Sequence, residues 1–244
     1  MGTSKSYADV NKKNMPNWPE LSRTVTRTCD GSTPTPDRTA GILRMYVEAI
    51  GGAGAASRVS NRSRKAARKT AKNIASVLGI VQAGGGIRDV LSYTGLSNID
   101  GKTVEEIINH LIEFCSGPGS TVDDQAAKEA SRILLEELMD SATDLNEIDT
   151  KLSQVFQTSD SEDLIIKYFA YYIYEHISIW FYDHLIKEKN QQDCESLFSH
   201  LRNFIVQRLG QLNKRNPLAS VDWSSVGADQ IISNIQRDVL TVFE

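Results

Sequence analysis

The chain has 244 residues, of which 40% are apolar, 24% charged and 7% aromatic, and its formal net charge is −4. This length allows one large domain or two small ones, and the composition predicts at least one hydrophobic core. The sequence shows no basic-then-apolar signal-peptide pattern and no long uncharged run, and its three scattered cysteines do not suggest a disulfide framework or a zinc cluster. We therefore expect a soluble, cytoplasmic protein with no membrane contact.

The charge is divided unevenly along the chain. Residues 1–72 carry a net charge of +9, whereas residues 73–244 carry −13. The basic front (residues 1–72) and the acidic back (residues 73–244) can attract each other or bind different partners. Composition leaves both possibilities open.

Residues 1–36 have the composition of an unfolded segment. They contain four of the six prolines, many Ser, Thr, Asn and Lys residues, and no clear apolar period. Such a segment buries too little apolar surface to offset the entropy lost on ordering. We predict a flexible N-terminal arm that reaches on the order of 120 Å when extended, followed by a folded domain over residues 37–244.

The remainder of the chain predicts one helix after another. Asp37 is a candidate N-cap for the first of them, and Thr103 with Glu106 forms a capping box before another. The Gly-rich stretches at 51–54, 84–86 and 117–119 end helices and lack the features of a phosphate-binding loop. The predicted helices span residues 38–50, 61–78, 104–114, 121–139, 145–156, 162–189, 193–212 and 228–239.

The segment 162–189 is apolar nearly all round between Tyr168 and Tyr182, which is typical of a buried central helix. Strand patterns are nearly absent from the sequence. The predicted fold is all-α, a multi-helix globular bundle preceded by the flexible arm. A division into two sub-bundles, about 37–142 and 143–244, remains an alternative, with a joint at 141–144 or 158–161.

No pattern in the sequence indicates an enzyme. The four histidines, His110, His176, His184 and His200, lack the spacing of a helical metal site, and we expect them to be packing or surface residues. A catalytic triad cannot be placed from spacing alone. We predict no catalytic residue, no metal and no cofactor. The aromatic residues between 168 and 182 are expected to belong to the core or an interface rather than to a ligand pocket.

A basic stretch follows the first Gly-rich segment. At helical spacing its basic side chains form a stripe that could follow a phosphate backbone, although no aromatic residue is interleaved for base stacking. The stripe could instead dock on the acidic back half or on a partner protein. The predicted basic face consists of Arg58, Arg62, Lys65, Lys69 and Lys72.

The N-terminus carries the most informative pattern. Gly2 follows the initiator methionine, so methionine removal is expected to expose an unhindered α-amine. The reference pKa of an α-amine, near 8, leaves a nucleophilic fraction at neutral pH. Gly2 and Ser6 also fit the myristoylation pattern. A third interpretation is that these residues are an ordinary start with no special role.

These features together resemble the QatB family of the bacterial Qat anti-phage system. The resemblance covers most of residues 1–140 and is carried by the opening MGTSKSY, the arm, the segment LRMYV at 43–47, the run GGAGAASR at 51–58, and GKTVEEI at 101–107. Ala8 and Asp9 stand where a Gly-Pro pair is expected in the family. We therefore expect the recognition sequence in the arm to tolerate variation at this point.

The resemblance implies a non-catalytic partner protein. The Qat system also contains an ATPase, a relative of the queuosine-pathway enzyme QueC, and a TatD-like nuclease. QueC activates a carboxylated deazaguanine with ATP and uses ammonia as the nucleophile. A QueC-like enzyme in defence could instead use the amine of Gly2, with Thr3, Ser4, Lys5, Ser6 and Tyr7 recognised in its cleft. The alternative function is a nucleic-acid-binding module that uses the basic face.

Overall fold

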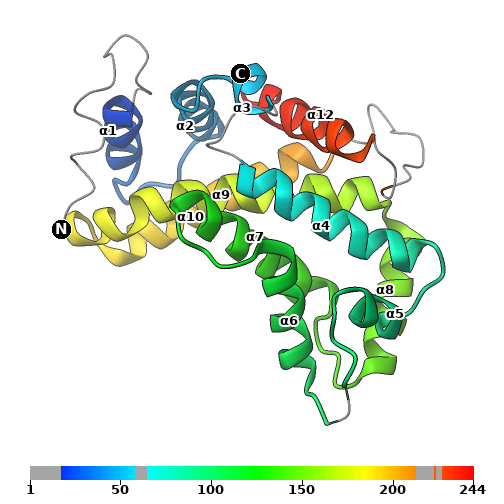
Figure 1. The fold of residues 1–244 in the computed structure, drawn as a ribbon. Coiled ribbons are helices and arrows are strands. Elements are labelled where there is room, and N and C mark those ends of the chain that lie inside the picture. Colours follow the sequence, from blue (N-terminus) through cyan, green and yellow to red (C-terminus); the bar gives the residue numbers. More distant parts are fainter. Residues whose placement is uncertain (1–17, 59–64, 100, 213–222, 224–226) are drawn as a thin grey trace.

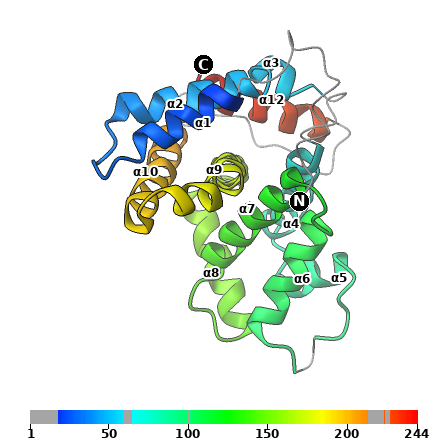
Figure 2. The ribbon, with the colours of Figure 1, turned by 90° about the vertical axis from the view of Figure 1, so that its left-hand side faces the viewer.

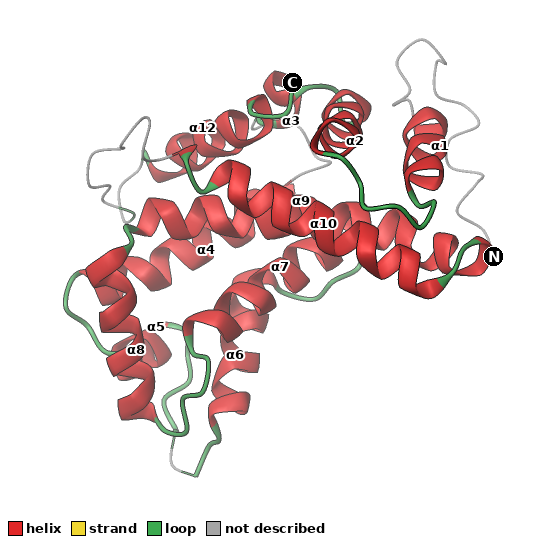
Figure 3. Cartoon of the chain, turned by 180° about the vertical axis from the view of Figure 1, so that it is seen from behind, coloured by secondary structure: helices red, strands yellow, loops and turns green. Residues whose placement is uncertain are grey.

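The computed structural model describes residues 18–58, 65–99, 101–212, 223 and 227–244. This part of the chain is helical and contains no β-strand, which confirms the predicted all-α fold (Figure 3). In chain order the helices are α1 (Trp18–Thr28), α2 (Pro36–Ala49), α3 (Ala53–Ala56), α4 (Lys65–Gln82), α5 (Ile87–Tyr93), α6 (Val104–Ser116), α7 (Val122–Leu138), α8 (Leu145–Thr158), α9 (Ser161–Glu188), α10 (Gln191–Leu209) and α12 (Ala228–Thr241).

The long helix α9 lies at the centre of the molecule, as its apolar surface predicts. Figure 2 looks along part of α9 and shows other helices on several sides of it. It packs against α1, α4, α7, α10 and α12. Its fully buried aromatic residues include Tyr168, Phe169 and Tyr172, so the aromatic segment belongs mainly to the core.

The two proposed sub-bundles share one core. The buried side chains form a single cluster that extends from Leu21 to Phe243. Helices of the first half, α4 and α7, pack directly on α9 of the second half (Figure 1). A boundary near residue 142 therefore separates no independent hydrophobic cores within the described part of the chain.

The predicted limit of the N-terminal arm at residue 36 is wrong. Residues 18–28 form α1, in which Leu21 and Val25 are fully buried. This helix packs against α2 and α9. An isolated helix of this length is marginal in water, so these tertiary contacts stabilise it. Residues 1–17 lie outside the described part of the chain.

Of the two capping signals named in the sequence, the structure confirms the capping box at Thr103 and Glu106 and corrects the N-cap at Asp37. The Thr103 hydroxyl accepts a hydrogen bond from the Glu106 backbone N–H at 3.2 Å, and the Glu106 carboxylate accepts one from the Thr103 N–H at 2.9 Å. The N-cap of α2 is Thr35 rather than the predicted Asp37, and its hydroxyl accepts from the Arg38 N–H at 3.3 Å. Pro36 then occupies the first turn of α2, where a missing N–H costs nothing.

Two short helices, α3 and α5, were not predicted, and in each a carboxylate distant in sequence accepts from the first backbone N–H. The Glu244 carboxylate accepts a hydrogen bond at 2.7 Å from the N–H of Ala53, the first residue of α3. The Asp149 carboxylate of α8 accepts one at 2.5 Å from the N–H of Ile87, the first residue of α5. The Gly-rich stretches do end helices: Gly84, after α4, has a φ of +90°, a conformation that favours glycine.

Candidate functional site

The base of the N-terminal arm is anchored on the central helix. Trp18, the first residue of α1, is half-buried and stacks on Trp180 of α9, with ring centroids 5.1 Å apart and an interplanar angle of 29°. Its ring also lies 6.3 Å from that of Phe181. These aromatic contacts hold the point at which residues 1–17 join the folded body. The predicted acceptor Gly2 and the predicted recognition residues Thr3, Ser4, Lys5, Ser6 and Tyr7 all lie outside the described residues.

Behind this junction, His176 occupies a packing position in the core. It is 6% exposed, and its Nδ1 lies 3.2 Å from the hydroxyl of Tyr46. The ring centroids of Trp18 and Tyr172 lie 6.4 and 5.7 Å from that of His176, both in tilted arrangements. The prediction that the histidines are packing or surface residues is confirmed for this one. Over the ranges that the structure describes, no group of three or more His, Cys, Asp or Glu residues could hold a metal ion.

The basic face is only partly assembled as predicted. Lys65, Lys69 and Lys72 follow one exposed side of α4. Arg58 is exposed in the segment after α3, and Arg62 lies outside the described residues. The described part of the predicted stripe is therefore a row of three lysines with one arginine near its start.

Acidic residues of other helices approach both ends of this lysine row. The ammonium of Lys72 lies 2.9 Å from a carboxylate oxygen of Asp229 on α12. At the start of α4, the Asp123 carboxylate of α7 accepts a hydrogen bond from the Ala66 N–H at 3.2 Å. The contacts agree with the attraction between basic front and acidic back that the charge distribution allowed. They reduce the positive potential that a phosphate backbone would meet.

A surface pocket of about 390 Å³ lies between α9 and α10. The guanidinium of Arg202 lies 5.2 Å from the ring centroid of Tyr171 and 6.0 Å from that of Tyr174, distances typical of cation–π contacts. The pKa of Glu175 is raised to about 7, mainly by burial; the nearby charge of Glu129 on α7 contributes to the rise and Arg202 opposes it. The pocket is lined by Tyr174, Ser178, Tyr182, Glu195, Phe198, Ser199, Arg202 and Asn203.

The shifted carboxyl predicts a pH-dependent stability. Because the pKa of Glu175 is higher in the folded state, that state binds more protons between about pH 4.5 and 7, and stability falls as pH rises through this window. We expect Glu175→Gln to stabilise the protein at pH 8 by about 1 kcal/mol, a figure reduced for solvent screening, and to leave it unchanged near pH 4.5. Thermal melts of both proteins across this range test the prediction, with the exposed Glu48→Gln of α2 as control. A constant difference at every pH would contradict it.

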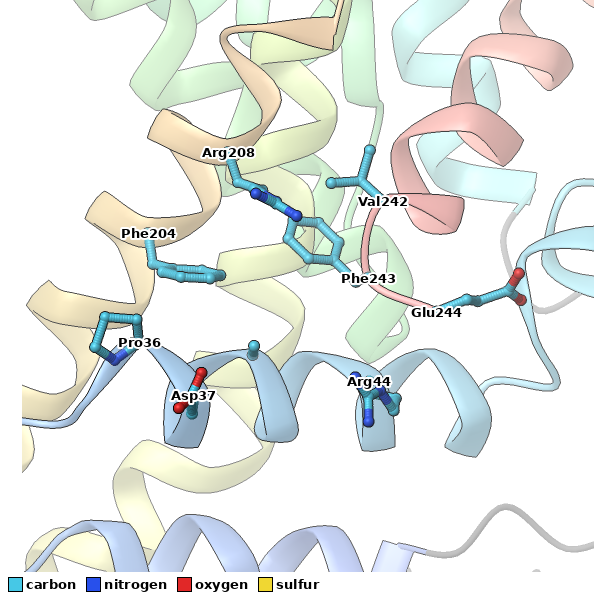
Figure 4. Close-up of a pocket in the computed structure, with 9 residues that line it drawn as sticks. Pro36, Asp37, Arg44, Phe204, Arg208, Val242, Phe243 and Glu244 are labelled. Atoms are coloured by element: carbon cyan, nitrogen blue, oxygen red, sulfur yellow. The ribbon is translucent and has the colours of Figure 1, made fainter.

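A second pocket, of about 280 Å³, lies where α2, the end of α10 and the end of α12 meet (Figure 4). Phe204 and Phe243 face the space between α10 and α2, while Arg208 lies beside Phe243. Charges of both signs surround it, including Asp37 and Arg208. No sequence pattern indicated either pocket. The second is lined by residues of α2, α10 and the C-terminal end, which are far apart along the chain, whereas the first lies between the consecutive helices α9 and α10.

The architecture defines the class of protein: a helical body built around one buried helix, with an N-terminal segment anchored at Trp18. The chain belongs to the QatB family, since the family model described as "Qat anti-phage system associated protein QatB" matches residues 51–243. It is thus an anti-phage defence protein. No curated protein and no solved structure matches the chain.

The matched region differs in extent from the predicted resemblance, which covered most of residues 1–140: the family match begins at residue 51 and continues to residue 243. It includes the Gly-rich run at 51–58 and the segment at 101–107, on which the resemblance partly rested, and it contains α3 to α12. The opening of the chain, α1 and α2 precede it. None of the described helices is both long and apolar enough to cross a membrane.

Proposed function

We propose that this chain is a non-catalytic helical scaffold of the Qat system, and that Gly2, exposed by removal of Met1, is the acceptor for deazaguanine conjugation by a QueC-like partner enzyme. The observation that supports it most is the anchoring of α1. Leu21 and Val25 are fully buried and Trp18 stacks on Trp180, so the helix that follows residues 1–17 is part of the core. A body of this kind can present its N-terminus to another protein.

The revised boundary also sets the reach of the arm. Residues 2–17 span at most about 50–60 Å from Trp18 when fully extended, instead of the 120 Å expected for a 36-residue arm. A partner that binds Thr3 to Tyr7 in its cleft must therefore sit close to the body, near α1 and the end of α9. The ATPase and the TatD-like nuclease of the system are further candidate partners.

The proposed chemistry needs only the amine from this chain. The carboxylate of the deazaguanine would attack the α-phosphorus of ATP in the partner's active site, forming an acyl adenylate and releasing pyrophosphate. The lone pair of the Gly2 nitrogen would attack the acyl carbon, AMP would leave, and the nitrogen would lose a proton to give an amide. Glycine suits this role because its amine is unhindered.

Intact-mass measurement tests the conjugation. Chain co-expressed with its neighbouring Qat genes should lose Met1 and gain the mass of one deazaguanine acyl group, and fragmentation should place that mass on Gly2. Chain expressed alone should lose Met1 only. Loss of methionine without any added mass in the co-expressed sample would contradict the proposed acceptor role.

The nucleic-acid alternative makes a separate prediction. If the lysine row of α4 bound a phosphate backbone, affinity would fall steeply with salt, because each neutralised phosphate releases counterions. We expect the parent protein to bind duplex DNA only weakly at low salt. We also expect the double variant Lys65→Glu, Lys69→Glu to be modified normally at Gly2. Fluorescence anisotropy measures the affinity for duplex DNA from low to physiological salt, with Glu105→Lys on α6 as a surface control. Tight, salt-sensitive binding that this double variant abolishes would favour the alternative.

A further inference from the structure

Two cysteines far apart in the sequence meet in the core. Cys29 directly follows α1 and Cys194 lies in the first part of α10, 165 residues later, yet their sulfur atoms are 3.4 Å apart. Their exposed fractions are 1% and 0%. The third cysteine, Cys115, is buried on α6. No sequence pattern indicated this pair, because three scattered cysteines fit no disulfide framework.

The backbone holds Cys29 against α10. Its N–H donates to the Val25 carbonyl at 3.0 Å, which continues the helical pattern of α1 by one residue. Two residues later Gly31 has a φ of +80°, and a Cβ placed on it would lie 3.3 Å from a carboxylate oxygen of Asp193. The turn after α1 is thus seated closely on the first turn of α10. Since a disulfide bond is about 2.0 Å long, the two sulfur atoms need to approach by only about 1.4 Å.

We propose that Cys29 and Cys194 are a reversible thiol–disulfide modification site whose oxidation ties the end of α1 to α10. The oxidant is a disulfide, of a small molecule or of another protein. One thiolate attacks it, forming a mixed disulfide and releasing one thiol. The second thiolate then displaces the other thiol. Two S–H bonds are lost and one S–S bond forms, while the two protons and two electrons pass to the oxidant, which leaves as two thiols.

This bond would fix the helix that carries residues 1–17. Burial and the neighbouring Cys194 raise the pKa of the Cys29 thiol to about 12, so it is protonated at neutral pH and reacts slowly while buried. Oxidation therefore proceeds during folding or when the turn after α1 opens briefly. Burial alone raises the pKa of the Cys115 thiol, also to about 12, so Cys115 is a matched control for a buried thiol.

The test uses the full chain equilibrated with oxidised and reduced glutathione in two ways: as native protein, and after unfolding in urea and refolding in the same buffer. The intramolecular bond should lower the intact mass by about 2 Da. Alkylation after denaturation should then label Cys115 alone. Peptide mapping should find the peptides that contain Cys29 and Cys194 linked by a disulfide bond. The melting temperature of the oxidised protein should exceed that of the reduced protein by about 5–15 °C.

Two variants make the result specific. Cys115→Ala should retain the mass loss and the rise in melting temperature, whereas Cys29→Ala should lose both while still unfolding cooperatively in reducing buffer. Full alkylation of all three cysteines under both oxidising conditions would overturn the proposal. A bond that includes Cys115, or one that joins two chains, would overturn it as well. None of these results depends on whether Gly2 is modified.

Discussion

A Gly2→Pro variant is expected to lose phage protection completely and to keep the melting temperature of the parent protein. Proline at this position offers a secondary ring nitrogen, which is a hindered nucleophile, and its ring fixes φ at about −65° in the segment that the proposed partner would bind. Substitutions outside the folded core usually change stability by less than about 0.5 kcal/mol. Phage challenge, intact mass and thermal melting of the same variant measure the three effects.

Gly2→Ala is the matched control for this experiment. It retains a primary amine after methionine removal, so modification and protection should both persist, with at most a reduced rate. An active, unmodified Gly2→Pro protein would contradict the assignment of the nucleophile. A large drop in its melting temperature would instead mean that residues before Trp18 contribute to the folded body.

The largest expected loss of stability from a single change near the N-terminus is that of Leu21→Ala. Leu21 is fully buried in α1, and removing its side chain leaves a cavity in the shared core. Such substitutions cost about 2–5 kcal/mol, which for a chain of this length lowers the melting temperature by roughly 5–15 °C. Denaturant and thermal unfolding of the full chain measure the loss.

Two comparisons locate the boundary of the folded body. Arg23→Ala, at an exposed position of the same helix, should leave stability nearly unchanged, and so should deletion of residues 2–17. If Leu21→Ala also had no effect, α1 would not belong to the core and the arm would extend to residue 36. A strong loss of stability on deletion of residues 2–17 would place the boundary of the folded body before Trp18.

The sequence by itself determined the fold class and most of the helices. The capping box at Thr103 and Glu106 and the continuous apolar surface of residues 168–182 depend on neighbours within a few positions along the chain. Signals of this kind act locally, because a helix cap joins residues two or three apart and a buried helix is apolar on every side. The family resemblance also depended on such local segments, and the family match confirmed it.

Helix α1 shows where local signals stopped being sufficient. Leu21, Val25 and Cys29 recur every four residues, a narrow stripe that could have indicated a helix. Because prolines and polar residues surround this stripe, the segment was interpreted as part of the flexible arm. A helix of 11 residues depends on packing for its stability. Contacts with α2 and α9 supply that packing.

Only the tertiary structure decided which distant residues meet. Glu244 caps α3, Asp149 caps α5, and Cys29 touches Cys194, although each pair is separated by many residues. The lysine row of α4 was visible in the sequence, but its pairing with Asp229 was not. Local periodicity determines which side of each helix is buried. Which distant residues come into contact depends instead on how all the helices pack together around α9.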